Sequence, residues 1–222
     1  MPDGSLSLPA RLYLLAWDTG RLKITGTGRL HHLVRAGALT ELAQRGLLVD
    51  DGGIAVPAGL DASTGDPVLD GLLELVRESR PRRWKNWVTL HARTTLDAVR
   101  EQLAAEGFLR AERRRVLGFL PSVDYALARV AVVDALREEA RQVLEEPLPA
   151  AEVPERDAAV VALAAAAELG TLVPAKDRRR HKARIDELTD RSGAAAPALR
   201  RVVREVNAAM IAATTAAATA AG

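Results

Sequence analysis

The sequence predicts a mainly α-helical fold, a single compact domain with two small β-hairpins that each follow a helix. Apolar residues recur at every third or fourth position through most of the 222 residues, which is the period of an amphipathic helix. Glycine and proline separate these stretches at intervals suited to short connections. Two of the helical stretches end at a glycine and lead into short apolar segments, the pattern of a β-hairpin.

The opening quarter of the chain predicts a helix and then a hairpin. Residues 12–16 predict a strand or a helical turn, followed by a loop. Residues 30–45 predict an amphipathic helix with a break near Gly37, and Gly46 ends that helix. An Asp-Gly pair then centres a hairpin over residues 47–56, because this pair tolerates the positive φ of a tight turn.

The middle of the chain repeats the same order. A helix is predicted over residues 67–80, with Asp66 as its N-cap and Pro81 as its end. A second helix, over residues 96–106, ends at Gly107 and leads into a hairpin over residues 108–120. Further helices are predicted over residues 123–146, 157–169, 176–189 and 198–210.

The predicted domain covers most of the chain. We expect an N-terminal tail over residues 1–7, one domain over residues 8–211, and an Ala/Thr-rich tail over residues 212–222 that frays. The N-terminus lacks the basic stretch and apolar core of a signal peptide, so we expect a cytoplasmic protein. The most apolar stretch, residues 158–167, is shorter than the ~20 residues that span a bilayer. Any membrane contact is therefore expected to be peripheral.

Composition excludes several classes of site. The chain has no cysteine, which rules out a disulfide framework, a thiolate metal site and a cysteine nucleophile. Its formal net charge is only +2, too low to indicate a polyanionic partner by itself. Only four of the 31 basic residues are lysines. This arginine excess, together with abundant alanine, is typical of a protein from a GC-rich genome.

No pattern of catalytic residues emerges, so we predict a protein that is not an enzyme and uses neither a metal nor a cofactor. His31 and His32 are adjacent on a predicted helix, so we expect their side chains to diverge on its surface. Asp66 and Asp70 are interpreted as a helix cap and a structural carboxylate. Trp87 is predicted to lie in the core, and Trp84 either there or at a membrane interface.

Two further features leave alternatives open. A helix followed by a hairpin is also the pattern of a winged-helix nucleic-acid binder, with Arg29, Arg35 and Arg45 as phosphate contacts. The acidic tip at residues 50–51 would repel DNA, so a nucleic-acid partner is not expected.

The second hairpin is the other open feature. Its apolar residues Leu117, Phe119 and Leu120 follow three arginines at positions 113–115. Such a segment suits membrane insertion beside lipid phosphates, a core of the hairpin itself, or self-association. A self-associating interaction scaffold is therefore the remaining alternative.

The order of landmarks along the chain resembles the Golgi phosphoprotein 3 family. The most specific series is Thr64-Gly65-Asp66, Leu69-Asp70, Pro81 and Asn86-Trp87, preceded by Glu41-Leu42-Ala43 with Arg45-Gly46 and followed by Arg93, Arg100, Leu103 and Gly107. The resemblance runs from about Leu8 to Met210.

The resemblance implies a domain that binds phosphatidylinositol 4-phosphate and attaches peripherally to the cytoplasmic face of a membrane. Carried onto this sequence, the head-group site keeps Arg35 and Arg93, whereas the family's tryptophan falls on Gly26 and its second arginine on Leu96. An anionic phospholipid is therefore the expected ligand. The resemblance also implies that the chain can form a homo-oligomer through the second hairpin. Eukaryotic members act at the Golgi on glycosyltransferase tails. Neither property transfers to a bacterial relative, so the protein partner stays open.

Overall fold

The computed structural model describes residues 6–59, 61–116, 120–145, 148–194 and 197–220. Its helices are α1 (Leu8–Leu15), α2 (Thr27–Gln44), α3 (Pro67–Glu78), α4 (Trp84–Thr89), α5 (Ala92–Ala105), α6 (Val130–Glu145), α7 (Glu155–Ala166), α8 (Lys182–Arg191), α9 (Pro197–Ala220) and the 3-10 helix η1 (Ala150–Glu152). Its strands are β1 (Trp17–Asp18), β2 (Lys23–Ile24), β3 (Leu48–Asp51), β4 (Ile54–Pro57), β5 (Arg82–Arg83), β6 (Leu109–Val116) and β7 (Leu120–Leu127). The predicted mainly α-helical fold with small hairpins is confirmed.

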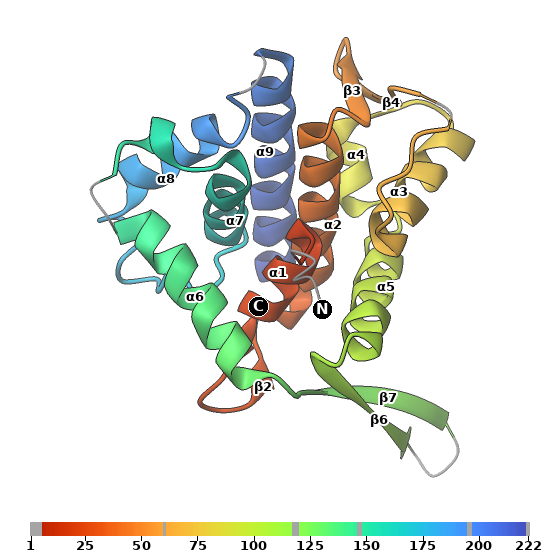
Figure 1. The fold of residues 1–222 in the computed structure, drawn as a ribbon, viewed down its shortest axis with the longest axis vertical. Coiled ribbons are helices and arrows are strands. Elements are labelled where there is room, and N and C mark those ends of the chain that lie inside the picture. The colour runs from red at the N-terminus through yellow and green to blue at the C-terminus, as the bar shows by residue number, and fades with distance from the viewer. Residues whose placement is uncertain (1–5, 60, 117–119, 146–147, 195–196, 221–222) are drawn as a thin grey trace.

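The helices are arranged around α2 and α9, which lie side by side at the centre (Figure 1). Helices α6, α7 and α8 lie on one side of this pair, and α3 and α5 on the other, while β6 and β7 extend away from the helices (Figure 1). The sheets are small and antiparallel: β1 pairs with β2, β3 with β4 and β4 with β5, and β6 with β7. Most of α2 is buried, because α1, α5, α7 and α9 all pack against it.

The predicted break at Gly37 is wrong, because α2 continues through this residue. Gly37 lies where α1 crosses α2. A Cβ atom at this position would stand 2.7 Å from the Leu12 Cδ1 and 3.3 Å from the Pro9 Cα. Gly37 thus permits a close approach of two helices and does not interrupt one.

The first hairpin forms as predicted, but the second differs. Strands β3 and β4 pair through the expected turn. In the second hairpin, Val123 belongs to β7, opposite Arg113, whereas the sequence places it at the start of a helix. The ladder continues to the pair Leu109 and Leu127, both buried in the core, and α6 begins only at Val130. A short apolar run does not by itself distinguish strand from helix.

Several other boundaries differ from those predicted. Residues 8–15 form helix α1, and the sequence misses β5 and α4. Helix α8 begins at Lys182, six residues later than predicted. The turns before it are held by Arg178, which pairs with Glu168 at 2.7 Å. Helix α9 continues to Ala220, ten residues beyond the predicted end at Met210, in line with the high helix propensity of alanine.

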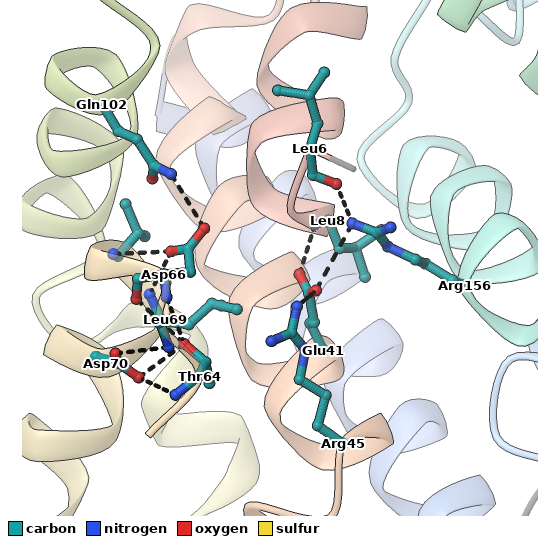
Figure 2. A network of polar contacts seen from close by, with 12 residues as sticks. Leu6, Leu8, Glu41, Arg45, Thr64, Asp66, Leu69, Asp70, Gln102 and Arg156 are labelled. Carbon is teal, nitrogen blue, oxygen red and sulfur yellow. Dashed lines mark hydrogen bonds and ion pairs between the residues drawn. The ribbon is translucent and has the colours of Figure 1, made fainter. Parts of the chain in front are cut away.

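The Thr-Gly-Asp segment builds the start of α3. Asp66 accepts hydrogen bonds from the backbone N–H groups of Val68 (2.9 Å) and Leu69 (3.0 Å), which confirms it as the N-cap. Its other carboxylate oxygen accepts one from the Gln102 side chain of α5 at 3.2 Å (Figure 2). The cap therefore also ties α3 to α5.

Asp70 organises the loop that precedes α3. Its carboxylate accepts hydrogen bonds from the Thr64 N–H (2.6 Å) and hydroxyl (2.7 Å), the Ser63 hydroxyl (2.8 Å) and the Gly65 N–H (3.1 Å). These bonds lower the pKa of Asp70, although burial acts to raise it. Asp70 is a structural carboxylate, as predicted.

A buried carboxylate anchors the start of α1. Glu41, 3% exposed, accepts a hydrogen bond from the Leu8 N–H at 2.6 Å. It also pairs with Arg45 at 2.5 Å and with Arg156 at 3.7 Å, and Arg156 donates a further bond to the Leu6 carbonyl (Figure 2). Glu41 thus acts as a cap for α1 from within α2 and joins α7 to both.

Candidate functional site

The predicted head-group residue Arg35 lies in the interior. It projects from α2 and is only 1% exposed. Its Nη2 donates a hydrogen bond to the His91 carbonyl at 2.6 Å, whereas its Nε and Nη1 have no hydrogen-bond partner among the described residues. Burial lowers the pKa of Arg35 to about 10. The side chain therefore keeps its positive charge at neutral pH, and two of its three guanidinium nitrogens have no partner among the described residues.

The carbonyl that Arg35 holds belongs to the first turn of α5. His91 is the N-cap of α5 and adopts a left-handed conformation with a φ of 52°. The His91 side chain makes no capping hydrogen bond, and the first N–H groups of a helix have no partner within the helix. Arg93 is exposed in the same turn and, in the part of the chain that the structure describes, makes no ion pair. The structure thus brings Arg35 and Arg93 to one helix start.

Two histidines complete this cluster, and the expectation that they diverge is wrong. The ring centroids of His31 and His32 are 3.9 Å apart. The His32 Nδ1 lies 3.3 Å from the Val88 carbonyl, within hydrogen-bonding distance. Partial burial lowers the pKa of both rings, and the positive charge of Arg93 lowers both further. We call Arg35, Arg93, His31 and His32, together with the first turn of α5, the α5-start cluster.

The pKa of His31 predicts acid sensitivity. It falls from an ordinary 6.5 to about 4 in the folded protein, through burial and then through His32 and Arg93. The unfolded chain therefore binds a proton on His31 at a higher pH than the folded chain does. The contribution of His31 to the free energy of unfolding is therefore complete above pH 6.5, and it is lost as the pH falls from 6.5 towards 4.

Urea unfolding at pH 7 and pH 4.5 measures this effect. We expect His31→Gln to lose less free energy of unfolding between these two pH values than the wild type does. Equal losses in the two proteins would contradict the assignment of acid sensitivity to His31.

The two positions that depart from the family pattern lie outside the cluster. Gly26 is the N-cap of α2, nine residues before Arg35, which is about 13 Å along a helix axis. It lines a separate cavity, of about 350 Å³, together with Arg137 and Arg141. Leu96 follows Arg93 on α5 and is only 6% exposed, so it belongs to the core.

Other arginines near the predicted site have different partners. Arg29 pairs with Glu168 at 2.6 Å. Arg100 pairs with Asp97 at 3.2 Å and lies 5.9 Å from the centre of the Tyr13 ring. Neither is free to supply a third cation beside Arg35. The histidine pair, whose close contact depends on the local packing, has no signal in the sequence beyond adjacency.

The residues predicted for the second hairpin are only partly described. Leu117 and Phe119 lie outside the described residues. Leu120 is the first residue of β7, where it pairs with Val116. Further along the same strand, Val123 is 47% exposed. Strands β6 and β7 extend beyond the helices (Figure 1).

The burial of α2 argues against a winged-helix function. A recognition helix must expose one face to the major groove, but α2 is covered from Leu33 to Ala43. Arg45 pairs with Glu41, and Asp50 accepts a hydrogen bond from the indole of Trp84 at 2.9 Å. Both Trp84 and Trp87 are fully buried, which confirms the core placement of Trp87.

The described residues show neither a spanning helix nor a metal cluster. Within them, no helix is both long and apolar enough to cross a bilayer. They also contain no group of three or more histidine, cysteine, aspartate or glutamate side chains that could hold a metal ion.

Comparison with protein families identifies the family of this chain. The sequence matches the family described as Golgi phosphoprotein 3 over residues 8–206, which is most of the 222-residue chain. A search of the curated proteins finds no match. The matched range begins at the first residue of α1 and ends within α9, so it takes in every element that builds the α5-start cluster. The chain therefore belongs to the Golgi phosphoprotein 3 family.

Proposed function

We propose that this protein is a peripheral membrane protein that binds the head group of an anionic phosphoinositide at the α5-start cluster. Phosphatidylinositol 4-phosphate is the ligand that family membership favours. The observation that carries the proposal is the buried guanidinium of Arg35, whose Nε and Nη1 lack partners among the described residues. A buried cation is destabilising unless an anion and further hydrogen bonds compensate it.

The two arginines have different roles in this proposal. Arg93 is exposed and contacts a lipid phosphate directly. Arg35 donates a hydrogen bond to the His91 carbonyl and so fixes where α5 begins. Its positive charge adds to the positive electrostatic potential at this helix start. The N-terminal end of a helix attracts anions through its free N–H groups and its dipole. The cluster thus offers a phosphate both charge and directed donors.

The histidines supply hydrogen bonds without charge. Both rings are neutral at pH 7, because their pKa values are lowered. A neutral imidazole both donates and accepts a hydrogen bond, which suits the hydroxyl groups of an inositol ring. Nothing in this role requires bond making or breaking, so the proposed activity is binding rather than catalysis, and it takes place on the cytoplasmic face of a membrane.

The hairpin of β6 and β7 is proposed as a second contact. The exposure of Val123 and the extension of the hairpin from the helices support this role. Leu117, Phe119 and Leu120 would then enter the membrane or meet a second copy of the chain. Mass measurement at increasing protein concentration, without lipid, separates the two outcomes.

Vesicle flotation tests the lipid proposal. Vesicles contain phosphatidylinositol 4-phosphate, phosphatidylinositol or phosphatidylserine in a neutral lipid background. We expect preferential binding to the 4-phosphate, and Arg93→Ala is expected to weaken it by about tenfold or more, the effect of losing one charge-assisted hydrogen bond.

Lys182→Ala provides the matched control. Lys182 is exposed on α8, on the other side of the fold from α5 (Figure 1), and its removal costs the same single positive charge. This variant is expected to bind as the wild type does. Equal binding of wild type and Arg93→Ala on every vesicle would overturn the proposal.

A further inference from the structure

A separate cavity lies between α7, α8 and α9, on the side of the fold away from α5 (Figure 1). Its volume is about 320 Å³, within the range of small-molecule sites. The aliphatic part of its lining consists of Ala162, Ala165 and Ala166 from α7, Ile185 from α8 and Ile211 from α9, and the other lining residues are polar or charged. Ile211 is 53% exposed, so part of this apolar wall faces solvent.

One buried side-chain oxygen that lines this cavity has no hydrogen-bond partner among the described residues. Asn207 of α9 is only 6% exposed, and its Oδ1 accepts no hydrogen bond from the described residues. Buried side-chain oxygens in native proteins almost always accept a hydrogen bond, because an unsatisfied one is destabilising. The oxygen therefore marks a position where a donor is missing.

The charged residues of the cavity are already paired with one another. Arg178 pairs with Glu168 at 2.7 Å, and Lys182 pairs with Asp186 at 2.7 Å. The two pairs contribute equal positive and negative charge. The Thr189 hydroxyl donates to the Ile185 carbonyl within α8, so this donor does not serve Asn207 either. The charged residues of the cavity therefore give no net electrostatic attraction for a charged ligand.

We propose that this cavity binds a neutral aliphatic molecule whose hydroxyl or amide N–H donates a hydrogen bond to the Asn207 Oδ1. The volume corresponds to about ten water-sized groups, at ~30 Å³ each. The aliphatic part of the ligand packs against the three alanines and two isoleucines, and the donor reaches the buried oxygen. This site is independent of the α5-start cluster and of lipid binding.

Two probes of matched size test the proposal by NMR titration of the isotopically labelled full chain. Hexan-1-ol and methyl pentyl ether have the same number of non-hydrogen atoms, but only the alcohol donates a hydrogen bond. We expect both probes to shift the signals of Ala166, Ile185 and Ile211. Hexan-1-ol should bind about fivefold more tightly, the value of one hydrogen bond. Hexanoate, which is charged, should bind more weakly than the alcohol.

Variants distinguish the hydrogen bond from the apolar wall. Asn207→Leu removes the acceptor at similar volume, so it should bind alcohol and ether equally. Ala166→Leu fills the cavity from a partly exposed position on α7 and should abolish binding of both probes, while exposed Ala208→Leu on α9 should bind as the wild type does. The proposal is overturned if no probe shifts these signals, or if the wild type binds alcohol and ether equally. The Ala166 variant keeps the test valid even if Asn207→Leu does not fold.

Discussion

Gly37→Val is expected to lower the free energy of unfolding by about 3 kcal/mol, which corresponds to a fall in Tm of about 6–12 °C for a chain of this length. The added side chain would meet Leu12 and the backbone of Pro9 where α1 crosses α2. Leu12 can move its side chain, but the Pro9 backbone at 3.3 Å cannot yield without shifting α1. The loss therefore comes from overpacking at a helix crossing.

Gly71→Val is the matched control for this prediction. Gly71 is an exposed helical residue of α3, and a Cβ atom there would meet nothing within 4 Å. Valine forms helix somewhat better than glycine does, so this variant should be as stable as the wild type or slightly more so. Thermal unfolding of both variants is the measurement, and similar Tm values for the two would contradict the close helix approach.

Glu41→Ala is expected to cost about 3 kcal/mol, because Glu41 is buried and its removal leaves a buried backbone donor and two partly buried arginines without this carboxylate. The Leu8 N–H would lose its acceptor at the start of α1, and Arg45 and Arg156 would lose their ion pairs with Glu41. Because Glu41 connects three helices, the loss should appear as a lower midpoint of one cooperative unfolding transition in urea.

Two variants calibrate the Glu41 result. Glu41→Gln keeps an acceptor for the Leu8 N–H but removes the charge, so it should lie between alanine and the wild type. Glu139→Ala removes a carboxylate that pairs with Arg11 at 3.0 Å but is 60% exposed, and it should cost less than about 1 kcal/mol. If Glu139→Ala proves as costly as Glu41→Ala, burial is not the source of the effect.

The candidate site was only half predictable from sequence. The family resemblance indicated Arg35 and Arg93, and the structure places both at the start of α5. The burial of Arg35 was not predictable. The sequence around a charged residue does not indicate which helices will cover it. The contact between His31 and His32 also escaped prediction, since backbone spacing alone places adjacent helical side chains apart.

Local chemistry explains which elements the sequence predicted correctly. Asp66 caps α3 through bonds to residues two and three positions away, and the Asp-Gly turn pairs strands that are neighbours in sequence. Such interactions depend on residue type and spacing alone. The boundary between β7 and α6 failed because an eight-residue ladder with β6 determines it, and that partner strand is not visible in the pattern of residues 120–127.

The sequence by itself determined the fold class, the Asp66 cap of α3, the first hairpin and the family, because each depends on residues close together in the chain or on an ordered series of landmarks. Only the tertiary structure decided what Gly37, Arg35, Glu41 and Asn207 do. Each of these residues acts through a contact with an element or a cavity that lies far away in sequence. Packing between distant elements determines which residues are buried. Burial in turn determines how much the absent Cβ of Gly37, the guanidinium of Arg35, the carboxylate of Glu41 and the amide of Asn207 affect stability or binding.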